Sequence, residues 1–281
     1  MIVAIANQKG GVAKTTSVIC LGGVLQENRP CLVVDLDPQA NLTIGLGVNV
    51  EDELLGTYDV MIEQAEVLDA IVPTKSGLSL LPTDITLAKG ETELLAKVGN
   101  FIILKERLTP ASEKFQHILI DCPPSLGLLT VNALSAADAV LIPVQCQFFA
   151  LKGLAALLET ISSIQRRLNP GLQILGILPT MAENTVMSRD VLASLKKRFK
   201  DIPVFDPVPK SVKFAESNLA GEPIHQYASD AKLVTPYRAI AKLIIGEQPS
   251  GKTTRQTSAI MTPYPPPIKS WQGLSSLTRQ P

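Results

Sequence analysis

Apolar residues follow two alternating patterns along most of this chain. Short runs of consecutive, often β-branched apolar residues, such as Ile118-Leu119-Ile120, are typical of strands buried on both faces of a parallel sheet. Longer stretches of helical character lie between these runs. The patterns predict strands at 2–6, 31–35, 78–81, 117–121, 139–143, 173–178 and 203–206, and helices at 14–28, 53–63, 92–108, 127–134, 150–167, 188–199 and 231–246.

This alternation predicts a doubly wound α/β fold, in which helices flank both faces of a mostly parallel sheet. Ligands in such folds bind beyond the carboxyl ends of the strands, so we expect the functional residues there. With 281 residues in all, the chain is long enough for one large domain over 1–247. Residues 248–281 are rich in Pro, Ser and Thr without an apolar period, which predicts a mostly disordered tail.

The composition of the chain limits the kinds of partner and ligand that we expect it to bind. The 26 Lys and Arg residues balance the 26 Asp and Glu residues, so any binding to nucleic acid must come from a local patch. No apolar run approaches the ~20 residues of a membrane-spanning helix, and the first strand is not a signal peptide. The 4 cysteines lie in apolar surroundings without metal-type spacing. We therefore expect a cytoplasmic protein with buried, reduced thiols.

A glycine-containing loop at residues 7–16 joins the first predicted strand to the first predicted helix. Its sequence is Asn-Gln-Lys-Gly-Gly-Val-Ala-Lys-Thr-Thr. Backbone N–H groups of such a loop and the helix N-terminus bind the phosphates of a nucleoside triphosphate. Lys14 would reach the β- and γ-phosphates, and the Thr15 hydroxyl would ligate Mg²⁺. The strict pattern G-x-x-x-x-G-K-[ST] is not met, because its glycines fall on Gln8 and Ala13.

Three aspartates end apolar strands. Asp35 and Asp37 close the second predicted strand, and Asp121 closes the fourth. At i and i+2 on a strand, Asp35 and Asp37 would point to the same side. Neighbouring carboxylates in an apolar strand cost too much free energy to serve only as core filling. We therefore expect these carboxylates beside the phosphate loop.

Three motifs together resemble the ParA/MinD/nitrogenase-iron-protein group. They are the deviant loop K-G-G-x-x-K-T-T, the segment VVDLDPQAN at 33–41 and the segment ILIDCPPSLG at 118–127. The chain resembles most closely the ParA branch of partition ATPases, as a Soj-like chromosomal or small-plasmid ParA or a carboxysome-positioning McdA-like protein. The resemblance implies ATP and Mg²⁺ as ligands, with the metal supported by Thr15, Asp35 and Asp121. It implies nucleotide contacts by Lys9, Gly10, Gly11, Val12, Ala13, Lys14, Thr15 and Thr16.

The resemblance also assigns two roles in hydrolysis. Asp37 matches the aspartate that orients the attacking water. Lys9 and Lys14 bind the phosphates, and Lys9 matches the signature lysine that crosses a dimer interface to the nucleotide of a facing subunit. ATP would therefore join a homodimer. The alternative for Lys9 is a solvated surface lysine.

The segment 206–218 resembles a late ParA segment that binds DNA without sequence preference. Lys210 and Lys213 occupy positions where relatives carry arginine, which keeps the charge but loses the bidentate fork. Pro207 and Pro209 lie where the adenine ring packs in relatives. The helix at 188–199 adds basic residues that could bind the phosphate backbone, unless they form only a solvated face. These additional residues are Arg189, Lys196 and Lys197.

Two positions depart from the family pattern. Ala13 replaces the usual glycine, which strains the loop if this position needs a positive φ and is harmless if the position is helical. Lys152 stands where many partition ATPases carry glutamate, and it resembles the carboxysome-positioning relatives, in which a lysine assists nucleotide binding across the dimer. The alternative for Lys152 is a charged residue at a helix start.

The resemblance implies an ATPase that dimerises on ATP and binds nucleoid DNA. A ParB-like or McdB-like partner would stimulate its slow hydrolysis and release it, moving plasmid, chromosome or carboxysome cargo. The chain does not end in a basic amphipathic helix, so we expect no membrane attachment. Two alternatives remain: a metabolic ATP-dependent enzyme of the same superfamily, and a DNA-binding scaffold with a degenerate loop.

Overall fold

The computed structural model describes residues 1–246 except 53, 148–149 and 229. The predicted tail at 248–281 lies outside these residues, so the tail and the domain boundary at 247 stay predictions. No helix in the described part is long and apolar enough to cross a membrane.

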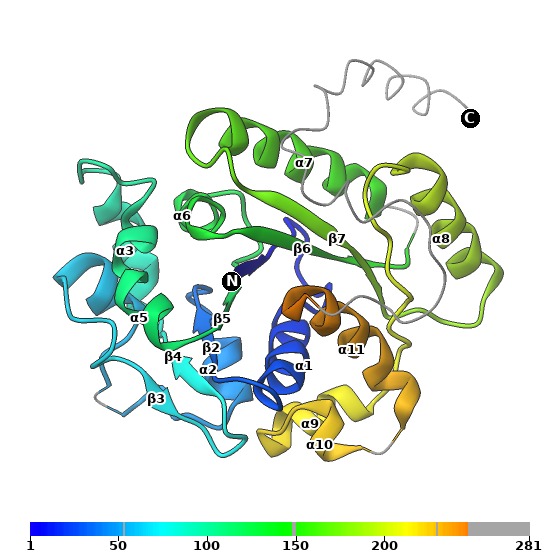
Figure 1. The fold of residues 1–281 in the computed structure, drawn as a ribbon, viewed down its shortest axis with the longest axis horizontal. Coiled ribbons are helices and arrows are strands. Elements are labelled where there is room, and N and C mark those ends of the chain that lie inside the picture. The colour runs from blue at the N-terminus through cyan, green and yellow to red at the C-terminus, as the bar shows by residue number, and fades with distance from the viewer. Residues whose placement is uncertain (53, 148–149, 229, 247–281) are drawn as a thin grey trace. The chain divides into compact units, whose positions relative to one another are not determined.

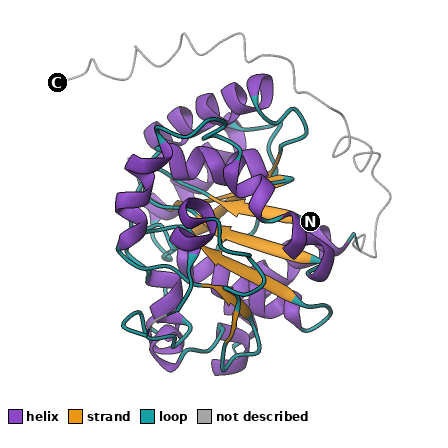
Figure 2. Cartoon of the chain, turned by 90° about the vertical axis from the view of Figure 1, so that its left-hand side faces the viewer, coloured by secondary structure: helices purple, strands orange, loops and turns teal. Residues whose placement is uncertain are grey.

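The described strands form one sheet in the order β3-β4-β2-β5-β1-β6-β7 (Figures 1 and 2). All neighbouring pairs are parallel except β3 with β4. Every residue of β2 and β5 is buried, which explains their uninterrupted apolar runs. The strands are β1 (Ile2–Ile5), β2 (Cys31–Asp35), β3 (Val72–Pro73), β4 (Ser79–Leu81), β5 (His117–Asp121), β6 (Ala139–Gln145) and β7 (Gln173–Thr180).

Helices cover both faces of this sheet, which confirms the predicted fold class (Figure 1). Helices α10 and α11 pack with α1 on one face, and α4 and α7 pack with α6 on the other. At Gly23 of α1, a Cβ atom would lie 2.6 Å from Pro223 and His225, so glycine permits the close approach of α10. The first helices are α1 (Lys14–Gln26), α2 (Asn41–Gly45), the π-helix η1 (Asp59–Glu63), α3 (Thr86–Leu94), α4 (Ile103–Arg107) and α5 (Thr109–Lys114).

The remaining helices follow β5 and the later strands. They are α6 (Leu128–Ala136), α7 (Ala150–Arg167), α8 (Val186–Arg198), α9 (Lys213–Ala220), α10 (Ile224–Tyr227) and α11 (Ala231–Ile245). The bounds of α7 match the sequence prediction, and those of α1, α6, α8 and α11 differ from it by no more than two residues.

Three predicted elements were wrong. Residues 203–206 form no strand, because only the isolated bridge between Ile177 and Val204 pairs there and Pro203 cannot donate to a ladder. The predicted helix at 92–108 is divided between α3 and α4 by a turn with Gly99 at φ 72°. The predicted helix at 53–63 is reduced to η1, and residue 53 lies outside the described residues. The short elements α2, α5, α9, α10 and β3 were missed because a periodic pattern needs more residues than they contain.

Candidate functional site

The predicted functional residues meet at the carboxyl ends of three adjacent central strands. In the Cα register, Asp121 of β5 pairs with Ile5 of β1 on one side and with Asp35 of β2 on the other. The loop at 7–16 follows β1, so it leaves the sheet directly beside both carboxylates. The fold therefore places a phosphate-binding loop and two aspartates at one edge, as expected for a doubly wound sheet.

Hydrogen bonds to β6, to β7 and within the loop itself hold the phosphate loop in place. The Thr180 hydroxyl donates to the Val12 carbonyl at 3.0 Å, and Asn7 Nδ2 donates to the Pro143 carbonyl at 2.6 Å. Asn7 Oδ1 in turn accepts from the backbone N–H of Lys9 at 3.0 Å. These bonds fix the loop backbone before any ligand arrives, which lowers the entropy lost on binding.

Ala13 is the N-cap residue of α1 and adopts a left-handed conformation, with φ 66° and ψ 36°. The sequence left open whether this position is strained. Because an L-residue with a Cβ atom is disfavoured in this region, Ala13 carries backbone strain at the phosphate loop. Gly11 also has a positive φ, 68°, but glycine adopts it without a Cβ penalty.

Lys14, Thr15 and Asp121 form the centre of the site. The Thr15 hydroxyl donates to Asp121 Oδ2 at 2.6 Å, and Lys14 is only 7% exposed. Asp121 Oδ1 is buried and has no hydrogen-bond partner among the described residues. Burial raises the pKa of Asp121 well above its usual range, and Asp35 raises it further, against the opposing effects of Thr15 and Lys14. A buried carboxylate oxygen without a partner favours binding of a cation.

Asp35 is already engaged by protein groups. It accepts from the Thr43 N–H at 2.9 Å, the Thr43 hydroxyl at 2.8 Å and the Asp37 N–H at 3.2 Å. Burial raises its pKa to about 7, and these hydrogen bonds oppose the rise. Asp35 therefore holds α2 against the end of β2. Because β2 ends at Asp35, Asp37 lies beyond the strand, where the i, i+2 alternation does not apply, and it accepts from the Gln39 N–H at 3.1 Å.

These residues fit a triphosphate with Mg²⁺. The loop and the N-terminus of α1 supply N–H groups, and Lys14 supplies a buried cation. No group of three His, Cys, Asp or Glu side chains gathers around a metal position within the described residues. Mg²⁺ would therefore take Thr15 and, through water, Asp121, and complete its shell with phosphate oxygens and water, as is usual for this ion.

Lys9 lies at the start of the same loop and is half-buried. Its Nζ donates to Gln145 Oε1 at 2.9 Å and to Gln147 Oε1 at 3.2 Å. The side chain is thus bound at the carboxyl end of β6. At the other end of the loop, Thr16 Oγ1 lies 3.5 Å from Asn218 Nδ2 of α9.

The segment predicted to meet the adenine ring runs beside the end of β7. The Val208 N–H donates to the Pro179 carbonyl at 2.8 Å, and the Ala182 N–H donates to the Val208 carbonyl at 3.0 Å. Val208 is buried, whereas Pro207 and Pro209 on either side of it are half-buried. Their adenine contact stays a prediction. Lys152 belongs to the first turn of α7, and its side chain lies outside the described residues.

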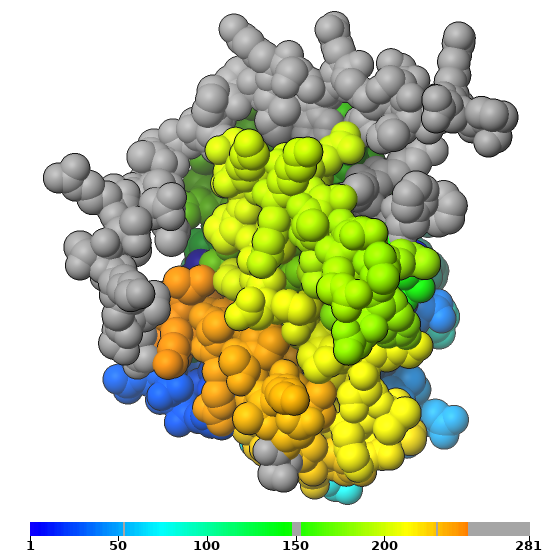
Figure 3. Space-filling view, turned by 90° about the vertical axis from the view of Figure 1, so that its right-hand side faces the viewer, coloured from blue at the N-terminus to red at the C-terminus, as the bar shows by residue number. Residues whose placement is uncertain are grey.

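The predicted DNA-binding residues do not share one environment. Lys210 pairs with Glu183 at 2.6 Å, and Lys213 pairs with Glu216 at 2.8 Å, so part of their charge is compensated. Arg189 donates to Asn184 at 3.1 Å. Lys196 and Lys197 are exposed in the last turn of α8 and form no ion pair with any described residue. Figure 3 shows α8, the segment after it and α9 as one continuous surface.

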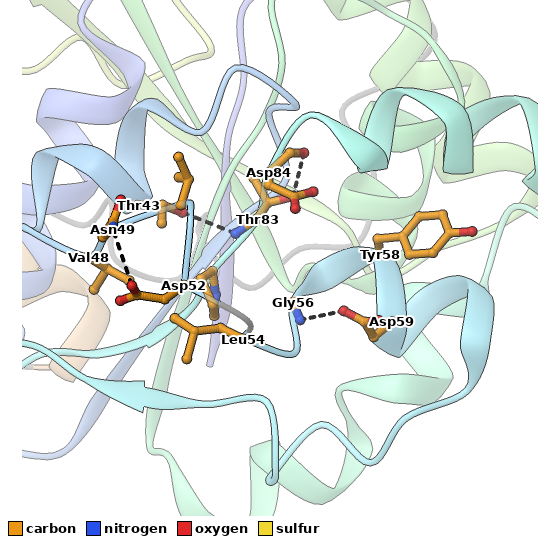
Figure 4. Close-up of a pocket in the computed structure, with 12 residues that line it drawn as sticks. Thr43, Val48, Asn49, Asp52, Leu54, Gly56, Tyr58, Asp59, Thr83 and Asp84 are labelled. Carbon is orange, nitrogen blue, oxygen red and sulfur yellow. Dashed lines mark hydrogen bonds between the residues drawn. The ribbon is translucent and has the colours of Figure 1, made fainter.

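A second hollow lies beyond β2 and β4, between α2 and residues 48–59 (Figure 4). The described residues that line it include no lysine or arginine, so it does not suit a phosphate. Its carboxylates stabilise local turns: Asp52 accepts from Asn49 at 3.1 Å, and Asp59 accepts from the Gly56 N–H at 2.7 Å. The Thr83 N–H donates to the Thr43 hydroxyl at 3.1 Å, which links this hollow to Asp35 (Figure 4).

Sequence reasoning missed the residues that support the site. Thr43, Thr180, Gln145 and Gln147 all contact predicted site residues, but none belongs to a motif with a fixed spacing. Asn7 begins the loop, and its residue type alone predicts no role for it. Only tertiary contacts reveal Thr180, Gln145 and Gln147, because their partners lie at least 136 residues away in the chain.

Comparisons with known proteins agree with this geometry. A family model described as "AAA domain" matches residues 1–174. The chromosome partitioning protein ParA of Caulobacter vibrioides is 39% identical over 253 residues, which cover 88% of this chain and 94% of that protein.

Solved structures show the same fold. The structure of cobyrinic acid a,c-diamide synthase from Mycobacterium smegmatis, with bound ATP analog and magnesium, is 38% identical with a TM-score of 0.78, covering 89% of this chain and 96% of that one. An ATP complex of a Cyanothece McdA variant is 26% identical with a TM-score of 0.82, covering 89% and 98%. The sheet order, the loop after β1 and these matches show that the chain belongs to the ParA family of partition ATPases, with a P-loop NTPase fold.

Proposed function

We propose that this chain binds ATP with Mg²⁺, hydrolyses it to ADP and phosphate, and forms a homodimer around the nucleotide. The observation that carries the proposal is the free, buried Asp121 Oδ1 beside the Thr15 hydroxyl and Lys14. The synthase structure with an ATP analog and magnesium, 38% identical to this chain, supports the same ligands here.

Each residue of the site has a role in this reaction. Lys14 and the loop N–H groups compensate the charge of the phosphates, and Thr15 and Asp121 hold the metal with its water. Bound Mg²⁺ supplies positive charge at the oxygens where negative charge develops. Asp37 orients the attacking water. Asp35 keeps α2 in place through Thr43, which makes it a positioning residue rather than a metal ligand.

Exposed apolar side chains around the site support a dimer. Large apolar residues that follow the carboxyl ends of β2, β4 and β7 remain open to solvent, and a second subunit would cover them. Their exposed fractions are 55% for Ile44, 65% for Ile85, 65% for Val186 and 57% for Met187. Lys9, at the same edge, would leave Gln145 and Gln147 and contact the phosphates of the facing subunit. Nucleotide state and dimer state would then be coupled.

The dimer binds DNA without sequence preference and works on the nucleoid in the cytoplasm. The exposed Lys196 and Lys197 supply charge for the DNA backbone. Lys210 and Lys213 contribute less, because each must first exchange a carboxylate partner for phosphate. A ParB-like or McdB-like protein stimulates the slow hydrolysis and releases the dimer, so that plasmid or chromosome cargo is segregated.

Two other functions have specific support. The 38% identity to a cobyrinic acid a,c-diamide synthase favours a metabolic ATP-dependent enzyme of the same superfamily. The fold match to McdA favours the carboxysome-positioning branch, to which Lys152 also points. The paired Lys9 and Lys14 motif fits either partition branch equally well.

DNA retention on random-sequence duplexes tests this function directly. The full chain should bind such DNA in the presence of Mg-ATP and release it in Mg-ADP, and Lys14→Ala should bind in neither. Lys114→Ala, an exposed lysine at the end of α5, just before the amino end of β5 and so at the opposite edge of the sheet from the site, is the matched control and should behave as wild type. ATP-independent DNA binding, or ATP-dependent amidation of a carboxylic acid substrate without DNA binding, would refute the proposal.

A further inference from the structure

We propose that Gln145 and Gln147 hold Lys9 in the free subunit, and that breaking this hold is a step in forming the ATP dimer. The inference rests on the proposed function of Lys9. Both amide oxygens accept from Lys9 Nζ, at 2.9 and 3.2 Å. The backbone of Lys9 is fixed as well, since its N–H donates to Asn7 Oδ1 at 3.0 Å.

The orientation of the Gln145 amide is set by a second contact. Its Nε2 donates to the sulfur of Met181 at 3.4 Å. A thioether accepts but cannot donate, so the amide nitrogen faces Met181 and the amide oxygen faces Lys9. The reversed amide would direct its NH₂ group at the ammonium. Met181 stands just beyond β7 with φ 51°, and the Cys146 N–H donates to the Thr180 carbonyl at 3.1 Å. The ends of β6 and β7 thus build this acceptor position together.

The two acceptors are neutral, and this decides how tightly Lys9 is held. Amide oxygens satisfy two N–H groups of the ammonium without cancelling its charge. Lys9 therefore stays positioned and remains attracted to a triphosphate on a facing subunit. A carboxylate at the same place would neutralise the ammonium and compete with the phosphates for it. Gln147 is exposed and Gln145 is half-buried, so Gln147 is the position at which charge can be changed without disturbing the core.

The variant Gln147→Glu tests whether these two acceptors restrain Lys9 in the free subunit. An exposed ion pair changes an equilibrium by about 2- to 5-fold. Since each dimer must release two copies of Lys9, the dimerisation constant should fall by about 4- to 25-fold, the square of that factor. The effect should shrink as salt is raised. Gln147→Leu, which removes the acceptor and keeps a side chain of similar bulk, should dimerise at least as well as wild type.

The measurement is sedimentation velocity with Mg²⁺ and a slowly hydrolysed ATP analogue over a range of protein concentrations. Gln173→Glu, an exposed change at the amino end of β7, controls for net charge and should match wild type. If Gln147→Glu dimerises as well as Gln173→Glu while wild type still requires the nucleotide, Gln145 and Gln147 do not restrain Lys9, and this proposal is refuted. If wild type itself stays monomeric, the proposed function fails instead, so the two failures are distinguishable.

Discussion

Ala13→Gly should stabilise the protein, because Ala13 is held at φ 66° and ψ 36°. An L-residue in this conformation costs about 1–2 kcal/mol relative to the right-handed region. Glycine removes that strain, but it loses about 0.5–1 kcal/mol through the greater freedom of the unfolded chain. Glycine also lacks the half-buried methyl group of Ala13, and losing its burial costs a few tenths of a kcal/mol more. The net expectation is a gain of about 0.5 kcal/mol in the free energy of unfolding.

The same change to glycine at an ordinary helical position provides a comparison, because there it should lower the free energy of unfolding. Ala239 is exposed in the interior of α11, where the same change to glycine should cost about 1 kcal/mol. The two variants should therefore differ by about 1.5 kcal/mol, or roughly 3–6 °C in Tm for a domain of this size. Thermal unfolding of the nucleotide-free full chain, followed by far-UV circular dichroism, measures both. If Ala13→Gly lowers Tm as much as Ala239→Gly does, residue 13 is not strained, and this account of the loop is wrong.

Three further predictions concern the site and the DNA surface. The raised pKa of Asp121 means that the folded protein keeps a proton that the unfolded chain loses near pH 4, so this group's contribution to stability falls as pH rises above 4. Without nucleotide, Asp121→Asn should be about 1–2 kcal/mol more stable than wild type at pH 8, with little difference at pH 4, and it should lose stabilisation by Mg-ATP. Thr180→Val removes the hydrogen bond to the Val12 carbonyl, which should cost about 1–3 kcal/mol and weaken nucleotide binding measured by calorimetry. Because the dimer carries two copies of each lysine, the double variant Lys196→Ala and Lys197→Ala should reduce the slope of log K for DNA against log salt by about 4.

Control variants define which results would contradict these predictions. Asp35→Asn removes a similar buried charge, but one amide group cannot accept from all three donors that Asp35 binds, so it should not gain stability at pH 8. An equal gain in both aspartate variants would contradict the different roles assigned to them. Thr43→Val should loosen α2 without changing the phosphate loop. An unchanged salt slope in the double lysine variant would leave α8 as a solvated basic face.

The central strands, and the positions of Asp35 and Asp121 at the ends of two of them, could be predicted from sequence, because burial on both faces leaves uninterrupted apolar runs. The structure of the regions after β2 and after β7 could not be predicted from sequence. Helix α2 is held by Asp35 through Thr43, and the segment after β7 is held by the carbonyl groups of Pro179 and Ala182 rather than by its own pattern. The sequence also left open the left-handed conformation of Ala13.

The most direct test of the account is the mass of the Lys9→Ala variant with Mg-ATP, measured by sedimentation velocity. Wild type should double its mass from 30.1 kDa when ATP is added. Lys9→Ala should bind ATP through Lys14 and Thr15 and yet remain a monomer. If Lys9→Ala forms the ATP dimer as readily as wild type, Lys9 does not couple nucleotide to assembly, and the central claim is contradicted.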